Sequence, residues 1–164
     1  MSGIKDLDIL LSNMEPVLDK RDFVFCSFPT FDWDKMRELN PVGFFQEKEG
    51  MTFILDLKDA IGKDIDCQSV YRLITLNIHS SLDAVGLTAA FSAKLTEKNI
   101  SANVIAAYYH DHIFVPKEKA EQALNAILEL QKRYPTQCGY LYMIHLHKPE
   151  NDSSGLWTIY PFRL

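Results

Sequence analysis

The sequence predicts an α+β fold in which antiparallel strands carry helices on one face of the sheet. In residues 120–128, apolar side chains recur at the helical steps that give a helix one buried face. In residues 51–57, Phe53, Leu55 and Leu57 occupy every second position, as side chains on one face of a strand do. From about residue 66, such segments follow the order strand, helix, strand, strand, helix, strand. This order is typical of a ferredoxin-like βαββαβ unit.

Composition fits one large domain or two small ones. The chain has 164 residues, is 47% hydrophobic and carries a formal net charge of -5. It has no run of Lys and Arg, which binding to nucleic-acid phosphates needs. It also has no signal peptide and no stretch near the ~20 apolar residues of a membrane span. The cysteines Cys26, Cys67 and Cys138 form no CxxC pair. We therefore expect a cytoplasmic protein with reduced thiols, no nucleic-acid partner and no membrane partner.

The first half predicts a leading helix, a short helix and three strands. Residues 4–14 are amphipathic and end at Pro16, and residues 23–28 are mostly aromatic or β-branched. Thr30 or Asp32 could cap a short helix over 34–39. Strands over 42–46 and 51–57 should form a hairpin in which Gly50 supplies a positive φ.

The polar segment 58–68 is the best candidate for a connection between two units. We place the boundary near residue 65. Residues 1–65 would then form an incomplete N-terminal unit with a leading helix. Residues 66–164 would form a C-terminal unit with additional C-terminal strands.

The second half opens with the apolar run 70–78, which favours a central strand over a buried helix. Ser80 and Ser81 are good N-cap residues, so a helix should begin there, with Gly86 one turn in. Asn99 is a plausible left-handed stop for that helix. A strand over 101–109, a turn at His110-Asp111 and a returning strand over 113–115 should follow. Then come a helix to about residue 133, a strand over 140–147, a loop over 149–155 and a last strand over 156–164.

Helices on one side of each sheet would leave the other face bare. Pairing of two such units, within one chain or between two chains, would bury that face. We therefore expect a homodimer.

Four stretches resemble small, mostly bacterial proteins with two ACT-like domains in tandem, related to the amino-acid-binding regulatory domains of aspartokinases. These are EKEG at 47–50, HSSLDAVGLTAA at 79–90, ISANV at 100–104 and YYHDHIFVP at 108–116. The resemblance implies a βαββαβ fold and a ligand site where the first strand of a unit passes into its first helix. Ser80 to Asp83 stand where the aspartokinase type has an Asp-X-Pro-Gly turn.

Catalysis is not expected, and neither is a cofactor. His110, Asp111 and His112, with His79, could supply metal ligands, but a turn flanked by histidines is the simpler interpretation. The chain has no GxSxG elbow and no glycine-rich phosphate loop. Tyr108 lacks the basic neighbours of an RNA-binding strand. A His/Asp metal-dependent enzyme remains the least favoured alternative.

Two functions remain. One is a sensing module without catalytic activity that binds an amino acid or similar small carboxylate and acts on a partner protein. The other is a protein-interaction or assembly module without a small ligand. Convergent polar groups favour the first. A helix N-terminus suits a carboxylate, so we expect it on the amides near residues 81–84, with the ligand's ammonium group on Asp83 or on Glu49 of a facing domain. The expected ligand-binding residues are Ser80, Ser81, Leu82, Asp83, Ala84, Val85, Gly86, Glu49 and Asn103.

Overall fold

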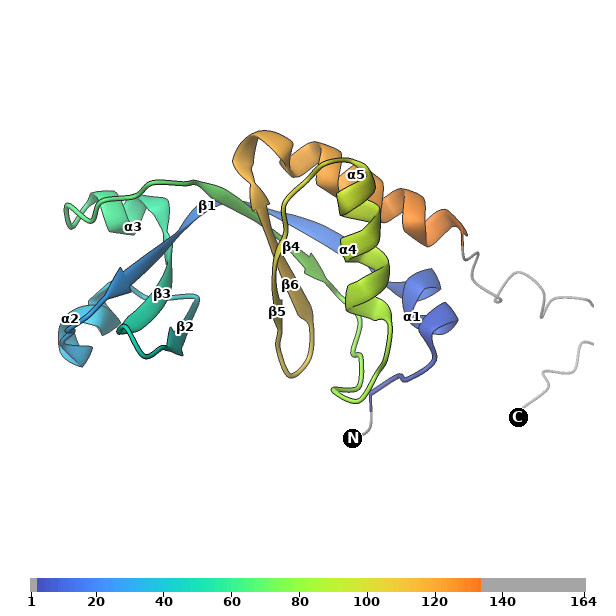
Figure 1. Ribbon diagram of the computed structural model, residues 1–164, viewed down its shortest axis with the longest axis horizontal. Coiled ribbons are helices and arrows are strands. Elements are labelled where there is room, and N and C mark those ends of the chain that lie inside the picture. Colours follow the sequence, from blue (N-terminus) through green and yellow to red (C-terminus); the bar gives the residue numbers. More distant parts are fainter. Residues whose placement is uncertain (1–2, 134–164) are drawn as a thin grey trace, which may run out of the picture. The chain divides into compact units, whose positions relative to one another are not determined.

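The computed structural model describes residues 3–133, except for the side chains of Lys35 and Arg133. The strands expected over 140–147 and 156–164 lie outside the described residues. The helices are α1 (Leu7–Asn13), α2 (Trp33–Glu38), α3 (Leu57–Ile61), α4 (Leu87–Glu97), the 3-10 turn η1 (Lys117–Lys119) and α5 (Ala120–Arg133). The strands are β1 (Pro16–Phe28), β2 (Gly43–Gln46), β3 (Met51–Asp56), β4 (Tyr71–Leu76), β5 (Asn103–Ala106) and β6 (Asp111–Pro116) (Figure 1). None of these helices is long and apolar enough to cross a membrane.

The six strands form one sheet with the order β2-β3-β1-β4-β6-β5, and all its pairings are antiparallel. The long strand β1 belongs to both halves of this sheet. Its first part pairs with β4, and residues 23–28 pair with β3. The C-terminal half of the sheet therefore consists of four strands, in the order β1, β4, β6 and β5. The α+β prediction with helices against antiparallel strands is confirmed.

β1 is longer than the strand predicted over 23–28, because it begins at Pro16. The sequence did not predict this extension, because the charged residues 19–22 interrupt the apolar pattern of a strand. The register with β4 shifts between Leu18 and Asp22, as in a β-bulge. Arg72 supports the irregular segment by donating two hydrogen bonds, at 2.9 and 2.6 Å, to the carbonyl oxygen of Asp19.

The predicted start of the second-half helix at Ser80 or Ser81 is wrong, because α4 begins at Leu87 with Gly86 as its N-cap. Gly86 has a φ of 103°, a left-handed conformation that cannot lie inside an α-helix. The segment 80–86 is instead a loop held against the N-terminal segment, where Ile4 forms a parallel bridge with Ser80.

The turn predicted at His110-Asp111 is also shifted. The chain reverses over 107–110, where the amide of Ala107 donates to the carbonyl of His110 at 3.2 Å. Asp111 is the first residue of β6 and lies opposite Leu76 of β4. The strand predicted over 101–109 is shorter than expected, spanning Asn103–Ala106.

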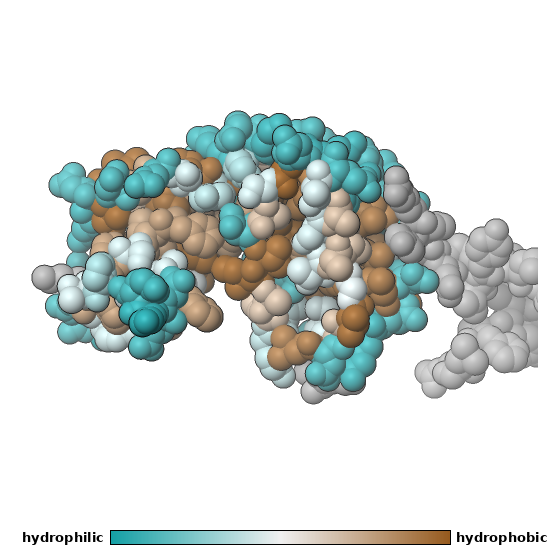
Figure 2. Space-filling model, viewed as in Figure 1, coloured by the Kyte–Doolittle hydropathy of each residue, from teal (hydrophilic) through white to brown (hydrophobic). Residues whose placement is uncertain are grey.

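Helices α1, α4 and α5 cover one face of β4 and β6. Figure 1 shows α4 and α5 beside these strands. The central buried residues of this cluster are Leu10, Leu11, Met14, Ile74, Leu76, Leu87, Phe91, Leu95, Ile113, Val115, Ala123 and Ile127. The outer surface over α5 is hydrophilic (Figure 2). Glu129 of α5 pairs with the buried ammonium of Lys94 at 3.0 Å. A second cluster packs α3 on β1 and β3 around Val24, Phe53, Leu55 and Ala60.

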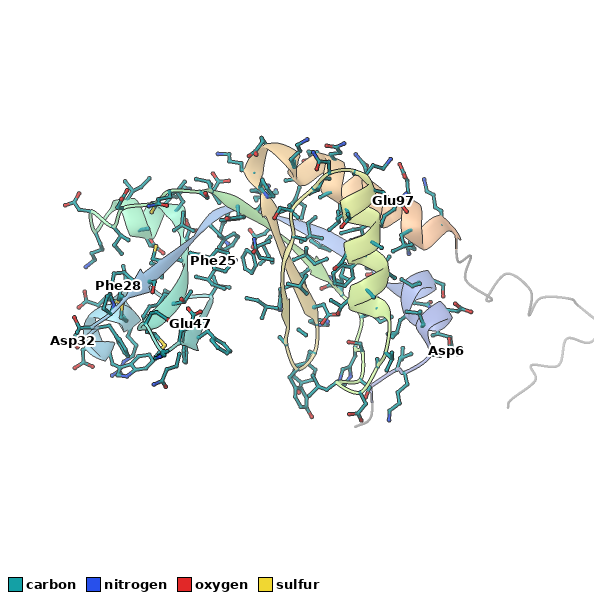
Figure 3. All side chains as sticks on the ribbon, viewed as in Figure 1. Asp6, Phe25, Phe28, Asp32, Glu47 and Glu97 are labelled. Carbon is teal, nitrogen blue, oxygen red and sulfur yellow. The ribbon has the colours of Figure 1, made fainter. Side chains whose placement is uncertain are left out.

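A third cluster lies on strand residues of the opposite parity, and its buried members are Phe23, Ile54, Leu73 and Phe114. Phe25 packs edge-on against Phe114, with ring centroids 5.2 Å apart, and against Tyr71 at 5.3 Å. Phe25 and Phe28, both labelled in Figure 3, lie on β1, but Phe28 packs instead against Phe53 in the second cluster. All members of the third cluster come from strands. Part of the sheet face without helices is thus buried by its own aromatic side chains.

Candidate functional site

The loop between β4 and α4 is fixed by hydrogen bonds to the N-terminal segment. The amide of Ile4 donates to the carbonyl of His79 at 3.0 Å, and the amide of Ser81 donates to the carbonyl of Ile4 at 2.9 Å. Gly3 approaches so closely that an added Cβ would lie 2.6 Å from the carbonyl oxygen of Ser80. The loop therefore has a defined position before any ligand arrives.

Several amides that the sequence suggested for a carboxylate already have acceptors inside the chain. Besides the amide of Ser81, the amide of Ala84 donates to the carbonyl of Ser81 at 2.8 Å. The amide of Asp83 donates to the Ser81 hydroxyl at 3.2 Å. The Ser81 side chain therefore caps the loop itself and not a helix.

The first turn of α4 is different, because no side chain caps it. The first amides of a helix have no intrahelical acceptor, and they carry the positive end of the helix dipole. In α4 these amides belong to Leu87, Thr88 and Ala89, since the amide of Ala90 is the one that donates to the carbonyl of the N-cap Gly86, at 2.9 Å. Thr88 is exposed. The first turn of α4 therefore has amide donors without an acceptor inside the helix.

The remaining predicted site residues are spread over the sheet. Asp83 is exposed and pairs with Lys5 at 3.4 Å. Glu49 lies in the exposed turn between β2 and β3, at the far edge from β5. Asn103 lies opposite Phe114, so it shares the face without helices. Within one chain, Glu49 and Asn103 are not brought to the α4 N-terminus.

Asp111, which we expected in a turn, is a largely buried residue at the start of β6. Its relative exposure is 6%, but no buried side-chain oxygen in the described residues lacks a hydrogen-bond partner, so its carboxylate is not a buried unsatisfied group. Burial raises the pKa of Asp111, an effect that the nearby His112 and His110 rings partly offset. The alternation of Asp111 with Ile113 and Val115 in the sequence was the available signal, since it places all three on one face of a strand.

The histidines around Asp111 do not form a metal centre with it. The His110 ring lies at the hairpin turn, with Nδ1 3.4 Å from the carbonyl of Ile78. His112 lies on the other face of β6, where Nδ1 is 3.0 Å from the Thr75 hydroxyl. Within the described part of the chain, no three His, Cys, Asp or Glu side chains are placed to hold a metal ion.

Four large hydrophobic side chains are exposed in the β4–α4 loop and the β5–β6 turn. Their exposures are 68% for Leu82, 82% for Val85, 61% for Tyr108 and 57% for Tyr109. The ring of His79 connects the two segments, with its centroid 5.3 Å from that of Tyr109. Exposed apolar groups of this kind are typical of interaction surfaces.

A separate hollow of about 680 Å³ lies beside the second part of β1. It is lined by Phe25, Cys26, Ser27, Phe28, Asp64, Ile65, Asp66, Gln68, Ser69 and Tyr71. Residues 24–28 pair with β3 on one side and with no described strand on the other. The hollow therefore follows an open strand edge in the N-terminal half, away from the loop before α4.

Two sequence models of the ACT domain match this chain, one over residues 2–72 and the other over residues 68–129. No curated protein sequence matches it. A crystal structure of a Vibrio cholerae protein of unknown function, described as a possible transport protein, is 50% identical. That match covers 79% of this chain and 99% of the Vibrio chain, with a TM-score of 0.69.

Two aspartate kinase structures share the fold at low identity. The ligand-free regulatory subunit from Thermus thermophilus is 12% identical, over 73% of this chain and 97% of that one, with a TM-score of 0.54. The Clostridium acetobutylicum aspartate kinase is 10% identical, over 70% of this chain and 34% of that one, with a TM-score of 0.56. The two consecutive domain matches show that the chain belongs to the ACT-domain family, as a protein with two ACT domains in tandem.

Proposed function

We propose that this protein is a regulatory module that binds an amino acid or a similar small carboxylate and acts on a partner protein. ACT domains are regulatory units and not catalytic ones. The observation that carries the proposal is that no side chain caps the N-terminus of α4. The loop before α4 is fixed by its contact with Ile4 and ends at Gly86, which has a left-handed backbone. Such a terminus offers amide donors and positive partial charge to a carboxylate.

In this proposal the ligand carboxylate binds the free amides of the first α4 turn. The loop before α4 forms the rim of the site, and its residues are Ser80, Ser81, Leu82, Asp83, Ala84, Val85 and Gly86. Gly86 contributes by ending the loop in the left-handed conformation from which α4 begins. Amides already bonded within the loop, such as that of Ser81, hold the rim in place.

A thermal-shift screen with the twenty amino acids tests the proposal, since a ligand at 100 times its Kd stabilises the folded state by about 2.7 kcal/mol. The position is tested by Thr88→Glu, with Thr88→Gln as its neutral control of equal size. Glutamate in the first turn is favourable for the helix but repels a bound carboxylate. We expect Thr88→Glu to fold and to lose binding, whereas Thr88→Gln should retain it. Equal binding by both variants would contradict this site.

We also propose that the protein is a homodimer. The exposed Leu82 and Val85 and the open edge of β1 support this. Glu49 and Asn103 would then reach a ligand only from the second copy. Light scattering at micromolar concentration should give twice the chain mass, and a strict monomer would rule out the dimer. Replacing Leu82 and Val85 with lysine should shift the mass toward the monomer.

The second candidate function is an assembly module that needs no small ligand. The exposure of Tyr108 and Tyr109 beside the β4–α4 loop favours it. The two functions differ in one result. If no amino acid shifts the melting temperature, while replacing Tyr108 and Tyr109 with serine abolishes self-association, the assembly function is the better account.

A further inference from the structure

Part of an inner strand of the sheet has a neighbour on one side only. β1 lies between β3 and β4, but β4 pairs with β1 only as far as Phe23. Residues 24–28 pair with β3 alone. In the C-terminal half, β1 pairs with the outer edge of that half's first strand, β4. No strand within residues 3–133 pairs in the same way with residues 24–28 of β1, the first strand of the N-terminal half.

The hollow of about 680 Å³ follows this unpaired edge. Phe25 and Ser27 share one face of β1, and Cys26 and Phe28 share the other, because side chains alternate along a strand. All four line the hollow, so it lies at the edge of β1 and not on one face. Residues of the 64–69 segment also line it, and within the described chain no backbone hydrogen bond joins them to β1. An added strand can therefore pair with this edge.

The lining of the hollow indicates which kind of strand fits. Its charged residues are Asp64 and Asp66, which are exposed and have no salt bridge among the described residues. The lining contains no Lys, Arg or His, whereas the rings of Phe25, Phe28 and Tyr71 offer apolar contacts. An extended segment that alternates basic and apolar residues matches both properties.

A second copy of the chain fits this edge less well than a separate basic segment does. Two β1 strands that paired edge to edge would each bring their own 64–69 segment to the shared space. Asp64 and Asp66 of both copies would then lie near one another, and like charges disfavour such a contact. The homodimer proposed above therefore has its better surface at the exposed Leu82 and Val85.

We propose that an extended, basic segment of the partner protein binds as an added strand along residues 24–28 of β1. Its main chain pairs with the strand edge, its apolar side chains contact Phe25 and Phe28, and its Lys or Arg side chains reach Asp64 and Asp66. Added strands take their affinity from main-chain hydrogen bonds and their specificity from side-chain contacts. This inference rests on the proposed function in one respect, that a partner protein exists, and it does not depend on the amino acid ligand.

Fluorescence anisotropy with labelled synthetic peptides and the full chain tests the inference. The probe is the end-blocked peptide KVKVKVK, in which basic and apolar residues alternate. The acidic peptide EVEVEVE tests the charge preference. KVKVKVK with all its interior amides N-methylated tests the main-chain pairing, since it has lost those donors. We expect KVKVKVK to bind and each control peptide to bind about tenfold or more weakly.

Hydrogen exchange locates the bound peptide. KVKVKVK should slow amide exchange within residues 24–28, because strand pairing protects the amides of the edge. The outer strand β2, at residues 43–46, is the control edge and should exchange as it does without peptide. Slower exchange at β2 with no change at residues 24–28 would overturn the inference.

Removing the two carboxylates should weaken the binding of KVKVKVK. The double variant Asp64→Asn, Asp66→Asn should bind about threefold to tenfold more weakly at physiological salt, as expected for two exposed charge pairs. Asp64 has a φ of 54°, which Asn also tolerates, so the variant should fold. The matched control Glu118→Gln, Glu121→Gln removes the same charge from exposed positions in η1 and α5 and should bind as wild type does.

Each remaining outcome also decides the matter. The inference is overturned if KVKVKVK does not bind, if either control peptide binds equally well, or if the folded Asp64→Asn, Asp66→Asn variant binds like wild type. Protection of residues 24–28 that rises with protein concentration in the absence of peptide would assign the edge to a second copy. The peptide comparisons use wild type, so they decide even if the double variant does not fold. The amino acid screen is a separate measurement, so a failed peptide titration leaves its result standing.

Discussion

Gly86 lies against Leu7, because a Cβ built on Gly86 would come within 2.9 Å of Leu7 Cδ2. The same glycine has a φ of 103° and marks the start of α4. Two local requirements therefore converge on one position, a left-handed backbone and a close approach to α1.

Replacing Gly86 with alanine should lower the free energy of unfolding by about 1–2 kcal/mol, since an L-residue is disfavoured in the left-handed region. Urea denaturation monitored by circular dichroism measures the change. Gly62→Ala is the matched control, because Gly62 has a right-handed φ of -62° and should change stability by less than about 0.5 kcal/mol. An equal effect of both substitutions would show that the conformation of Gly86 is not what requires glycine. Because of this strain, larger side chains at Gly86 would disturb folding as well as binding, so Thr88 is the better position to test the ligand site.

Phe114 should be among the most destabilising positions to truncate. It is 1% exposed and packs edge-on against Phe23 and Phe25, at centroid distances of 5.7 and 5.2 Å. Phe114→Ala should cost about 3–5 kcal/mol of unfolding free energy. Phe45→Ala, at an aromatic that is 71% exposed, is the control and should cost little in dilute solution. Comparable losses would mean that the aromatic cluster does not stabilise the sheet as its packing indicates.

His112 should make the fold sensitive to mild acid. Burial, with the neighbouring His110, lowers the pKa of His112 below its ordinary 6.5, whereas Asp111 acts in the opposite sense. The unfolded chain therefore takes up the proton first as the pH falls below about 6.5. Stability should then decrease until the pH passes the lower folded-state pKa. His112→Gln should remove this part of the pH dependence when unfolding is measured between pH 8 and pH 5, and an unchanged slope would contradict the assignment.

Cys26 should resist alkylation in the folded protein. Burial, with a contribution from the adjacent Cys67 thiol, raises the pKa of Cys26 to about 11. At pH 8 the reactive thiolate is then about one molecule in a thousand. Iodoacetamide pulses followed by mass spectrometry should label the less buried Cys67 before Cys26. Labelling in urea controls for intrinsic reactivity, since both thiols should react at similar rates there, and early labelling of Cys26 without urea would contradict its burial.

The spacing of apolar residues was sufficient to predict the helices and strands whose side-chain pattern lies within one segment of the chain. The 3.6-residue spacing after Pro116 predicted α5, and the apolar run from Val70 predicted β4. α5 buries one face, which gives apolar residues a helical spacing, and β4 lies inside the sheet, which gives a continuous apolar run. The motifs in 79–116 identified the family in the same way, because their residues are consecutive.

Tertiary structure decided the features that depend on distant partners. The loop over 80–86 replaces a helix because Ile4 bonds to it and because Gly86 is held left-handed beside Leu7. No spacing in the sequence reports a contact with residues about 75 positions away.

The candidate site, too, could be predicted only in part from the sequence. The sequence alone predicted the strand-to-helix region of the proposed site, with the serines and the glycine that would form its rim. Only the tertiary structure decided that the Ser81 amide is already bonded, that the open amides belong to α4 further along, and that Asp111 is buried. The physical reason is that a hydrogen bond or a burial cost is set by what lies across the sheet, whereas the sequence reports only the neighbours along the chain.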